Sequence, residues 1–134
     1  MTGAAPGPAE FHRAAVAAAA LFLEGSGYRV LDEGWECPEG RIDIIAERSG
    51  ALAAVSVLER RAGEAARGRE SAPRLAGAAE AWAAASGAAG AEFRFEEVSV
   101  TEVPGGGAIL RHRRSDGPPC PARAPRGDRG GACR

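Results

Sequence analysis

Residues 40–61 read GRIDIIAERSGALAAVSVLERR, a stretch that predicts two β-strands joined by a tight turn. The first strand is rich in isoleucine and carries one acid, Asp43, among apolar neighbours. Ser49 and Gly50 are typical turn residues. The second strand, residues 51–58, is almost wholly apolar, as expected of a strand buried on both faces. A carboxylate in such a place is destabilising unless it is paired, hydrogen-bonded or bound to a metal, so Asp43 needs an explanation.

Periodic patterns on both sides of this strand pair predict one sheet and two helices. Apolar residues recur at three- and four-residue spacing in two alanine-rich segments, residues 9–24 and 72–86. Strands are expected over five segments, residues 28–35, 41–47, 51–58, 92–103 and 108–111. The order is α-β-β-β-α-β with one further strand. A single mixed sheet flanked by two helices, an α/β fold, satisfies it.

Three breaks in these patterns have local interpretations. Gly34 interrupts the first strand, which suggests a β-bulge there. In the strand over residues 92–103 the apolar alternation changes phase near Glu96 and Glu97, and a second bulge would explain the change. Residues 60–71 are polar and contain glycine, so we expect a long loop or a frayed helix between the third strand and the second helix.

Composition divides the chain into three parts. Residues 1–8 form a leader of small residues and proline, residues 9–111 form the folded domain, and residues 112–134 form a tail rich in Arg, Gly and Pro. Leader and tail have almost nothing to bury and are expected to be disordered. Residues 1–110 carry 10 Arg and 16 acids, a net charge of −6, whereas residues 111–134 carry 7 Arg and 2 acids, a net charge of +5. The domain is therefore acidic and the tail basic.

Membrane insertion and a disulfide framework are both unexpected. The longest apolar run, residues 14–23, is too short to span a bilayer and is followed at once by Glu24. It also lacks the basic start and cleavage pattern of a secretory signal, so we expect a cytoplasmic protein without a membrane partner. Cys37, Cys120 and Cys133 are odd in number and far apart, which argues against disulfides and a zinc site.

Motifs spread over about residues 11–112 resemble the YraN family of small bacterial proteins. The matching positions are Leu23-Glu24, Gly27 to Leu31, Trp35, Gly40, Ile42 to Ala46, Val55, Val57, Arg60, Arg74-Leu75, Ala79, Trp82, Arg94-Phe95, Val98 and Val100. The resemblance implies a restriction-endonuclease-like fold with an αβββαβ core, related to Holliday-junction resolvases. It also implies a role connected with DNA or RNA.

The resemblance further implies a nuclease-type site with a helix glutamate, a Gly-Glu-Ile-Asp pair and a Glu-x-Lys motif. Such converging carboxylates hold one or two Mg²⁺ ions that activate water, and the lysine orients the nucleophile. In this chain the corresponding positions are Val16, Arg41, Ser56 and Leu58. Only Asp43 is retained, and the chain contains no lysine at all.

These replacements favour a catalytically inactive, degenerate member. Strand alternation predicts that Asp43, Ser56 and Leu58 share one face. A lone carboxylate beside a hydroxyl is a poor Mg²⁺ site, and Arg41 would repel the ion and pair with Asp43 instead. We therefore expect no metal site and no cofactor, with Mg²⁺ required only if cleavage is retained. Asp43 is then the one candidate catalytic residue.

Other candidate residues have simpler interpretations. Glu39 or Glu59 could rebuild an acidic site, but the first lies in a loop and the second faces away from Ser56. His12 and His112 are expected to be solvated, and the helix face that carries Trp82 is expected to be core. Cys37 has no nearby base in the sequence that would make it a nucleophile.

The resemblance implies DNA or RNA as a partner, and the sequence identifies no protein partner. The candidate phosphate-binding residues flank the former nuclease site and the start of the tail: Arg60, Arg61, Arg67, Arg69, Arg74, Arg111, Arg113 and Arg114. Tail residues Arg123, Arg126 and Arg129 could add contacts without sequence preference. The negative charge of the domain argues the other way. A nuclease fold that binds nucleic acid weakly, a structural or protein-interaction module, and a residual metal-dependent endonuclease therefore stay open as alternatives.

Overall fold

The computed structural model describes residues 8–61, 64–65, 71–114 and 120–121. The elements are α1 (Pro8–Gly25), β1 (Arg29–Cys37), β2 (Gly40–Arg48), β3 (Ala51–Arg60), α2 (Ala72–Ala85), β4 (Glu92–Glu102), β5 (Ala108–Arg113) and β6 (Cys120–Pro121). The strands form one sheet in the order β1-β2-β3-β4-β5, and β6 pairs with β4. Strands β3 and β4 run parallel, and the other pairs are antiparallel. The expected α/β fold, one mixed sheet flanked by two helices, is confirmed.

The central hairpin forms as its sequence predicts. Strands β2 and β3 pair in register from Arg48 opposite Ala51 to Ile44 opposite Val55. Ser49 and Gly50 connect them, and both have positive φ angles, 54° and 80°. A two-residue turn with positive φ at both positions matches the right-handed twist of an antiparallel pair.

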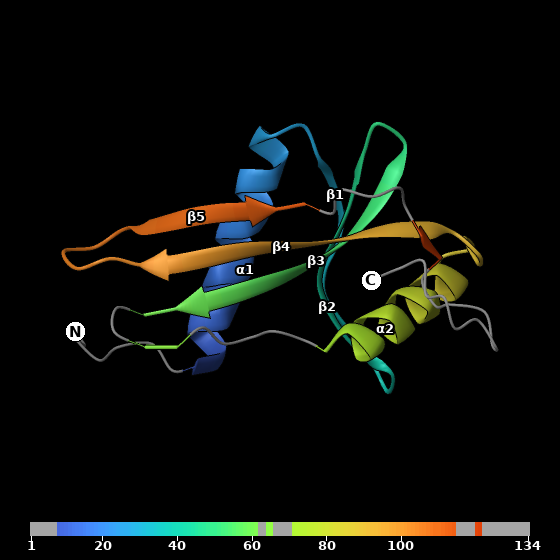
Figure 1. Cartoon of the computed structure of the whole chain (residues 1–134), viewed down its shortest axis with the longest axis horizontal. Helices are drawn as coiled ribbons and strands as arrows, with labels where there is room; N and C mark the ends of the chain where they lie inside the picture. Colours follow the sequence, from blue (N-terminus) through green and yellow to red (C-terminus); the bar gives the residue numbers. More distant parts are fainter. Residues whose placement is uncertain (1–7, 62–63, 66–70, 115–119, 122–134) are drawn as a thin grey trace.

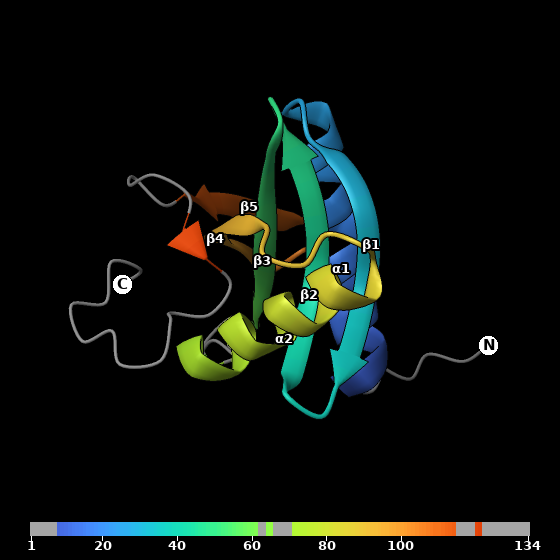
Figure 2. The same ribbon diagram turned by 90° about the vertical axis from the view of Figure 1, so that its right-hand side faces the viewer.

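Helices cover the two faces of the sheet, which explains why β2 and β3 are buried on both sides (Figures 1 and 2). The α1 face buries Leu23 and Ala19 against alternate residues of β3, Val55 and Val57 among them. The α2 face buries its own apolar residues, with Trp82 in the core as expected, against β2 and the first halves of β3 and β4. In Figure 1 α2 lies toward one end of the sheet, and α1 lies behind β3, β4 and β5.

Strand β4 corrects the predicted bulge near Glu96. Its parallel register with β3 is continuous from Phe93 to Thr101. The apolar phase changes because the two halves of the strand bury opposite faces: Phe93 packs with α2, whereas Val98 and Val100 pack with α1. A change of covering helix can thus imitate a bulge in the sequence pattern.

The bulge expected at Gly34 lies elsewhere. The β1–β2 register shifts between Val30 and Asp32, three residues before Gly34, and then continues in phase to Cys37. Gly34 has a φ of 65°, so the residue type suits its backbone conformation although the pairing around it is regular.

The start of α2 is fixed against the start of β2. Ser71 caps the helix by accepting a hydrogen bond from the backbone N–H of Arg74, and Pro73 occupies the first turn. A Cβ atom at Gly40 would lie 2.5 Å from the carbonyl oxygen of Arg74. Only glycine permits this approach, which sets the helix beside the strand that carries Asp43.

The C-terminal part of the domain extends beyond the expected limit. Strand β5 ends at Arg113, not at residue 111, and β6 lies within the segment expected to be a tail. The expected disorder of the leader and the tail concerns residues 1–7, 115–119 and 122–134, which lie outside the described residues. In the described part of the chain no helix is long and apolar enough to cross a membrane.

Candidate functional site

Asp43 is buried and each of its carboxylate oxygens has a partner. Oδ1 lies 2.9 Å from Nε2 of His12 and 3.1 Å from Nε of Arg41. Oδ2 accepts a hydrogen bond of 2.8 Å from the backbone N–H of Val57. The expected ion pair with Arg41 is therefore present, together with two contacts that the sequence did not suggest.

The contact with Val57 replaces a missing rung of the β2–β3 ladder. The paired register of the two strands ends at Ile44 and Val55, so the N–H of Val57 lies just past the last pair. An unpaired N–H in this buried region would be destabilising, and the Asp43 side chain satisfies it. The acid thereby closes the gap between two diverging strands.

His12 of α1 joins two acids that are distant in the sequence. Its Nε2 atom faces Asp43, and its Nδ1 atom faces Oε2 of Glu59 at the end of β3. A neutral imidazole can donate from one nitrogen only, so donation to two carboxylates requires the imidazolium form. The hydrogen bond to Asp43 raises the pKa of His12 above its ordinary value of 6.5; burial opposes this rise, and the hydrogen bond to Glu59 adds to it.

The prediction that His12 is solvated is therefore wrong. His12 precedes Val16 by four residues, so both side chains lie on the face of α1 that meets the sheet. Val16 is buried in the α1-side core. This chain thus has an apolar residue where the resemblance implies a helix glutamate, and it has a basic residue one turn earlier. The four-residue spacing between His12 and Val16 was the sequence feature that could have placed the His12 side chain on the buried face of α1.

Asp43 also fails to share a face with Ser56 and Leu58 as strand alternation predicted. Ile42 packs in the α2-side core and Ile44 in the α1-side core, although alternation would place residues two apart on the same face. The backbone therefore departs from regular alternation at Asp43. Its carboxylate lies with His12 and Glu59 on the α1 side, and Ser56 and Leu58 alternate with the α1-facing residues of β3.

The residues around Asp43 do not fit a hard divalent cation. Glu59 is the other nearby acid, but the His12 ring lies between the two carboxylates and engages both. Arg41 adds a second positive charge on Asp43. Within the described ranges, no group of three or more His, Cys, Asp or Glu side chains has the arrangement of a metal site. The donor set is one of internal ion pairs, unlike the open oxygen cage that Mg²⁺ requires.

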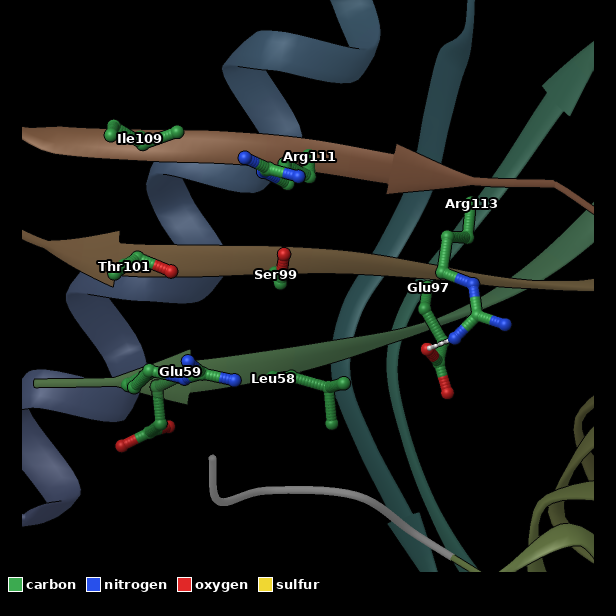
Figure 3. Close-up of a pocket in the computed structure, with 9 residues that line it drawn as sticks. Leu58, Glu59, Glu97, Ser99, Thr101, Ile109, Arg111 and Arg113 are labelled. Atoms are coloured by element: carbon green, nitrogen blue, oxygen red, sulfur yellow. Dashed lines mark ion pairs between the residues drawn. The ribbon is translucent and has the colours of Figure 1, made fainter. Parts of the chain in front are cut away.

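A second polar region lies on the face of the sheet opposite to α1, beyond the part of that face that α2 covers. A pocket of about 490 Å³ extends over β3, β4 and β5 (Figure 3). We call this the open sheet face, and its members are Leu58, Arg60, Glu97, Ser99, Thr101, Ile109, Arg111 and Arg113. Apart from these residues, Glu59 of the same strand also lines the pocket. Three of the predicted nucleic-acid-binding arginines thus meet on one surface.

The other predicted arginines lie elsewhere. The Arg61 guanidinium lies 4.4 Å from the centre of the Phe11 ring, on the side of α1. The Arg114 guanidinium lies 5.7 Å from the Tyr28 ring centre. Arg74 is exposed in the first turn of α2. Arg67 and Arg69, like Arg123, Arg126 and Arg129 of the tail, fall outside the described residues.

A buried polar cluster behind β5 corrects a second histidine prediction. Glu96 is buried, and its Oε1 atom accepts hydrogen bonds from the hydroxyl of Tyr28 at 2.9 Å and from Nε2 of His112 at 2.8 Å. His112 was expected to be solvated, but its side chain is only 9% exposed because its ring packs edge-on against Tyr28. Burial, followed by the hydrogen bond to Glu96, raises the pKa of Tyr28 to about 12.

Comparison with known proteins finds one family and several relatives. The profile of "Uncharacterised protein family UPF0102" matches residues 17–100. A UPF0102 protein of Beutenbergia cavernae is 32% identical over 105 residues, which cover 74% of this chain and 88% of that protein. One from Moorella thermoacetica is 35% identical over 89 residues, 63% of this chain and 74% of that protein. One from Paenarthrobacter aurescens is 43% identical over 49 residues, which cover 37% of this chain and only 40% of that protein.

Proposed function

Since the chain belongs to the UPF0102 family, the YraN family named by its sequence motifs, we propose that it is a nuclease-fold protein that binds nucleic acid without cleaving it. The observation that carries the proposal is the engagement of Asp43. Asp43 is the one acid retained from the implied nuclease site, and both of its carboxylate oxygens already have partners within the protein.

The absence of cleavage is argued from the chemistry of the site. Metal-assisted phosphodiester hydrolysis needs carboxylates that share a cation and leave room for water and phosphate. Here Asp43 is neutralised by His12 and Arg41, and Leu58 replaces the implied lysine with an apolar side chain. These contacts stabilise the fold around Asp43 and leave its carboxylate poorly suited to a metal ion.

Binding is argued from the arginines. Arg60, Arg111 and Arg113 lie on the open sheet face, where no helix of the described chain covers them. Guanidinium groups bind phosphate through parallel hydrogen bonds, and a surface that neutralises phosphates gains affinity by counterion release. The net charge of the domain is negative, so binding would depend on this local concentration of arginine.

The test is a combined binding and cleavage assay with branched and single-stranded DNA and RNA. The full chain and an Asp43→Asn variant are compared in Mg²⁺, Mn²⁺ and EDTA. Asparagine keeps an acceptor for the Val57 N–H, which favours a folded variant. We expect binding that weakens steeply as salt is raised and no product in any metal.

Two outcomes would contradict the proposal. Metal-dependent product that disappears in Asp43→Asn would show that Asp43 is catalytic. The lack of any salt-sensitive binding by the wild-type chain would favour a structural or protein-interaction module that keeps only the fold.

A further inference from the structure

The open sheet face has an ordered arrangement of donors across three strands. In the pairing register Arg60 of β3 is beside Thr101 of β4, and Ser99 of β4 is beside Arg111 of β5. Residues 99 and 101 of β4 are half-buried and present their hydroxyls on the same face, as Figure 3 shows. Two hydroxyls in the middle strand are thus flanked by one arginine on each outer strand.

The two flanking arginines are not used by the fold. In the part of the chain that the structure describes, neither the Arg60 nor the Arg111 side chain forms a hydrogen bond or an ion pair, and both residues are exposed. Their Cα atoms are separated by two interstrand spacings, roughly 10 Å, and by one two-residue step along the strands. Arginine side chains are long enough to reach toward each other over the central strand. Two cations facing one polar surface repel each other unless an anion lies between them.

At the opposite end of the pocket the arginine is already paired with an acid. Arg113 pairs with Glu97 at 3.5 Å, as the dashed line in Figure 3 marks. The Glu97 carboxylate would repel a phosphate there. The anion position is therefore at the other end of the pocket, around Arg60, Thr101, Ser99 and Arg111. The acid that lines that end, Glu59, is already paired with His12.

We propose that Arg60 and Arg111, with the hydroxyls of Ser99 and Thr101, bind the phosphodiester backbone of a nucleic acid across β3, β4 and β5. This inference rests on the proposed function and assigns it to one surface. It excludes Asp43 and the arginines near α1 from the contact. Among the described residues that line the pocket no side chain is aromatic, so the bases have no stacking partner there. Binding is therefore independent of base sequence.

The buried cluster behind β5 supports this geometry. His112 lies between Arg111 and Arg113 in the sequence and points to the opposite face, where it bonds to Glu96. That contact holds β5 in an orientation in which Arg111 and Arg113, its neighbours in the sequence, lie on the open sheet face. His112 is therefore a positioning residue for Arg111.

The experiment measures the affinity of the full chain for a labelled oligonucleotide as a function of salt. The test variant is Arg60→Gln/Arg111→Gln, and each single variant is measured as well. Arg13→Gln is the matched control, because Arg13 is exposed on α1 and the substitution removes the same charge. A tail variant, Arg123→Gln/Arg126→Gln/Arg129→Gln, tests the other basic segment. Unfolding temperatures confirm that each variant is folded.

We expect each single substitution on the open sheet face to weaken binding by about tenfold, the effect of one charge-assisted hydrogen-bonding group. The double variant should lower the slope of log affinity against log salt by roughly 2, one phosphate for each arginine. Ser99→Ala/Thr101→Val should weaken binding less and leave the slope unchanged. Oligonucleotides of different base sequence should bind alike.

The failures are distinguishable. If the wild-type chain does not bind at low salt, the proposed function is wrong, and the inference falls with it. If the double variant binds like Arg13→Gln while the tail variant loses binding, the protein binds nucleic acid but not through the open sheet face. That second outcome overturns the inference and leaves the proposed function intact.

Discussion

The Nε2 atom of His12 lies 2.9 Å from Oδ1 of Asp43, so a residue near the start of α1 holds the acid at the centre of the sheet. The same ring holds Glu59 through its other nitrogen. One protonated imidazole thus balances two buried carboxylates, and Arg41 shares the first of them. This contact gives Asp43 a structural role at the position where the resemblance implies a catalytic acid.

Removal of His12 should destabilise the fold. In His12→Ala, Asp43 keeps Arg41 and the Val57 N–H, but Glu59 stays buried without the partner seen here. Breaking a buried ion pair by deleting one member costs about 3 kcal/mol, and the partial exposure of His12 reduces this to about 2 kcal/mol. Urea unfolding measures the difference. Arg13→Ala, an exposed change beside it, should alter stability by less than about 0.5 kcal/mol, and an equal loss in both variants would contradict this role.

The same contacts predict how stability depends on pH. The folded pKa of His12 is raised above its unfolded value, so its contribution to stability is complete below about pH 6.5 and is lost as pH rises through the folded pKa. The free energy of unfolding should therefore fall as pH rises from 6.5 through the folded pKa of His12. The decrease should vanish in His12→Gln. A wild-type profile that rises over the same interval would contradict the assignment.

Asp43 should prove essential to stability, whatever its part in function. Asp43→Ala removes the acceptor of the Val57 N–H and one carboxylate partner of both His12 and Arg41, and we expect a loss of about 3–5 kcal/mol. Asp43→Asn retains an acceptor and should lose less. Amide hydrogen exchange gives a local readout, because the Val57 amide should lose protection in Asp43→Ala. Unchanged protection at Val57 would contradict the proposed bridge between the strands.

Tyr28 offers a direct check on the cluster behind β5, because it is the single tyrosine of the chain. Its pKa of about 12 means that ultraviolet absorbance of the folded protein should show phenolate only near pH 12, whereas the unfolded chain titrates near 10. Glu96→Gln removes one cause of the shift and should lower the midpoint, which burial keeps above 10. The stability linked to this group is present below pH 10 and is lost through 12. A midpoint near 10 in the folded wild type would contradict the cluster.

The sequence predicted the fold well because local patterns and the covering helices agree over most of the chain. The isoleucine-rich strand, the Ser49-Gly50 turn and the two alanine-rich helices all appear where their residues indicate. The errors arose where the pattern has two physical causes. In β4 the apolar phase changes because a different helix covers each half of the strand. In β1 the bulge lies between Val30 and Asp32, whereas the glycine that suggested it, Gly34, lies in regularly paired strand.

The site was less predictable because it depends on contacts between distant residues. The pairing of Asp43 with Arg41 followed from their positions two apart, but His12 is 31 residues away from Asp43 and Glu59 is 47 residues away from His12. Alternation placed Glu59 on the other face from Ser56, which was correct, and placed Asp43 with Ser56, which was wrong. The backbone is irregular between Ile42 and Ile44, and nothing in the residue types of Ile42, Asp43 and Ile44 indicates this.

The most direct test of the claim that Asp43 serves the fold, and not a metal, is the unfolding temperature of wild type and Asp43→Asn during titration with Mn²⁺, with and without the oligonucleotide. A ligand that binds the native state raises this temperature by mass action. If Asp43 serves the fold, Mn²⁺ shifts the unfolding temperature of both proteins equally, with or without nucleic acid. A rise that is specific to the wild-type chain and absent in Asp43→Asn would contradict it.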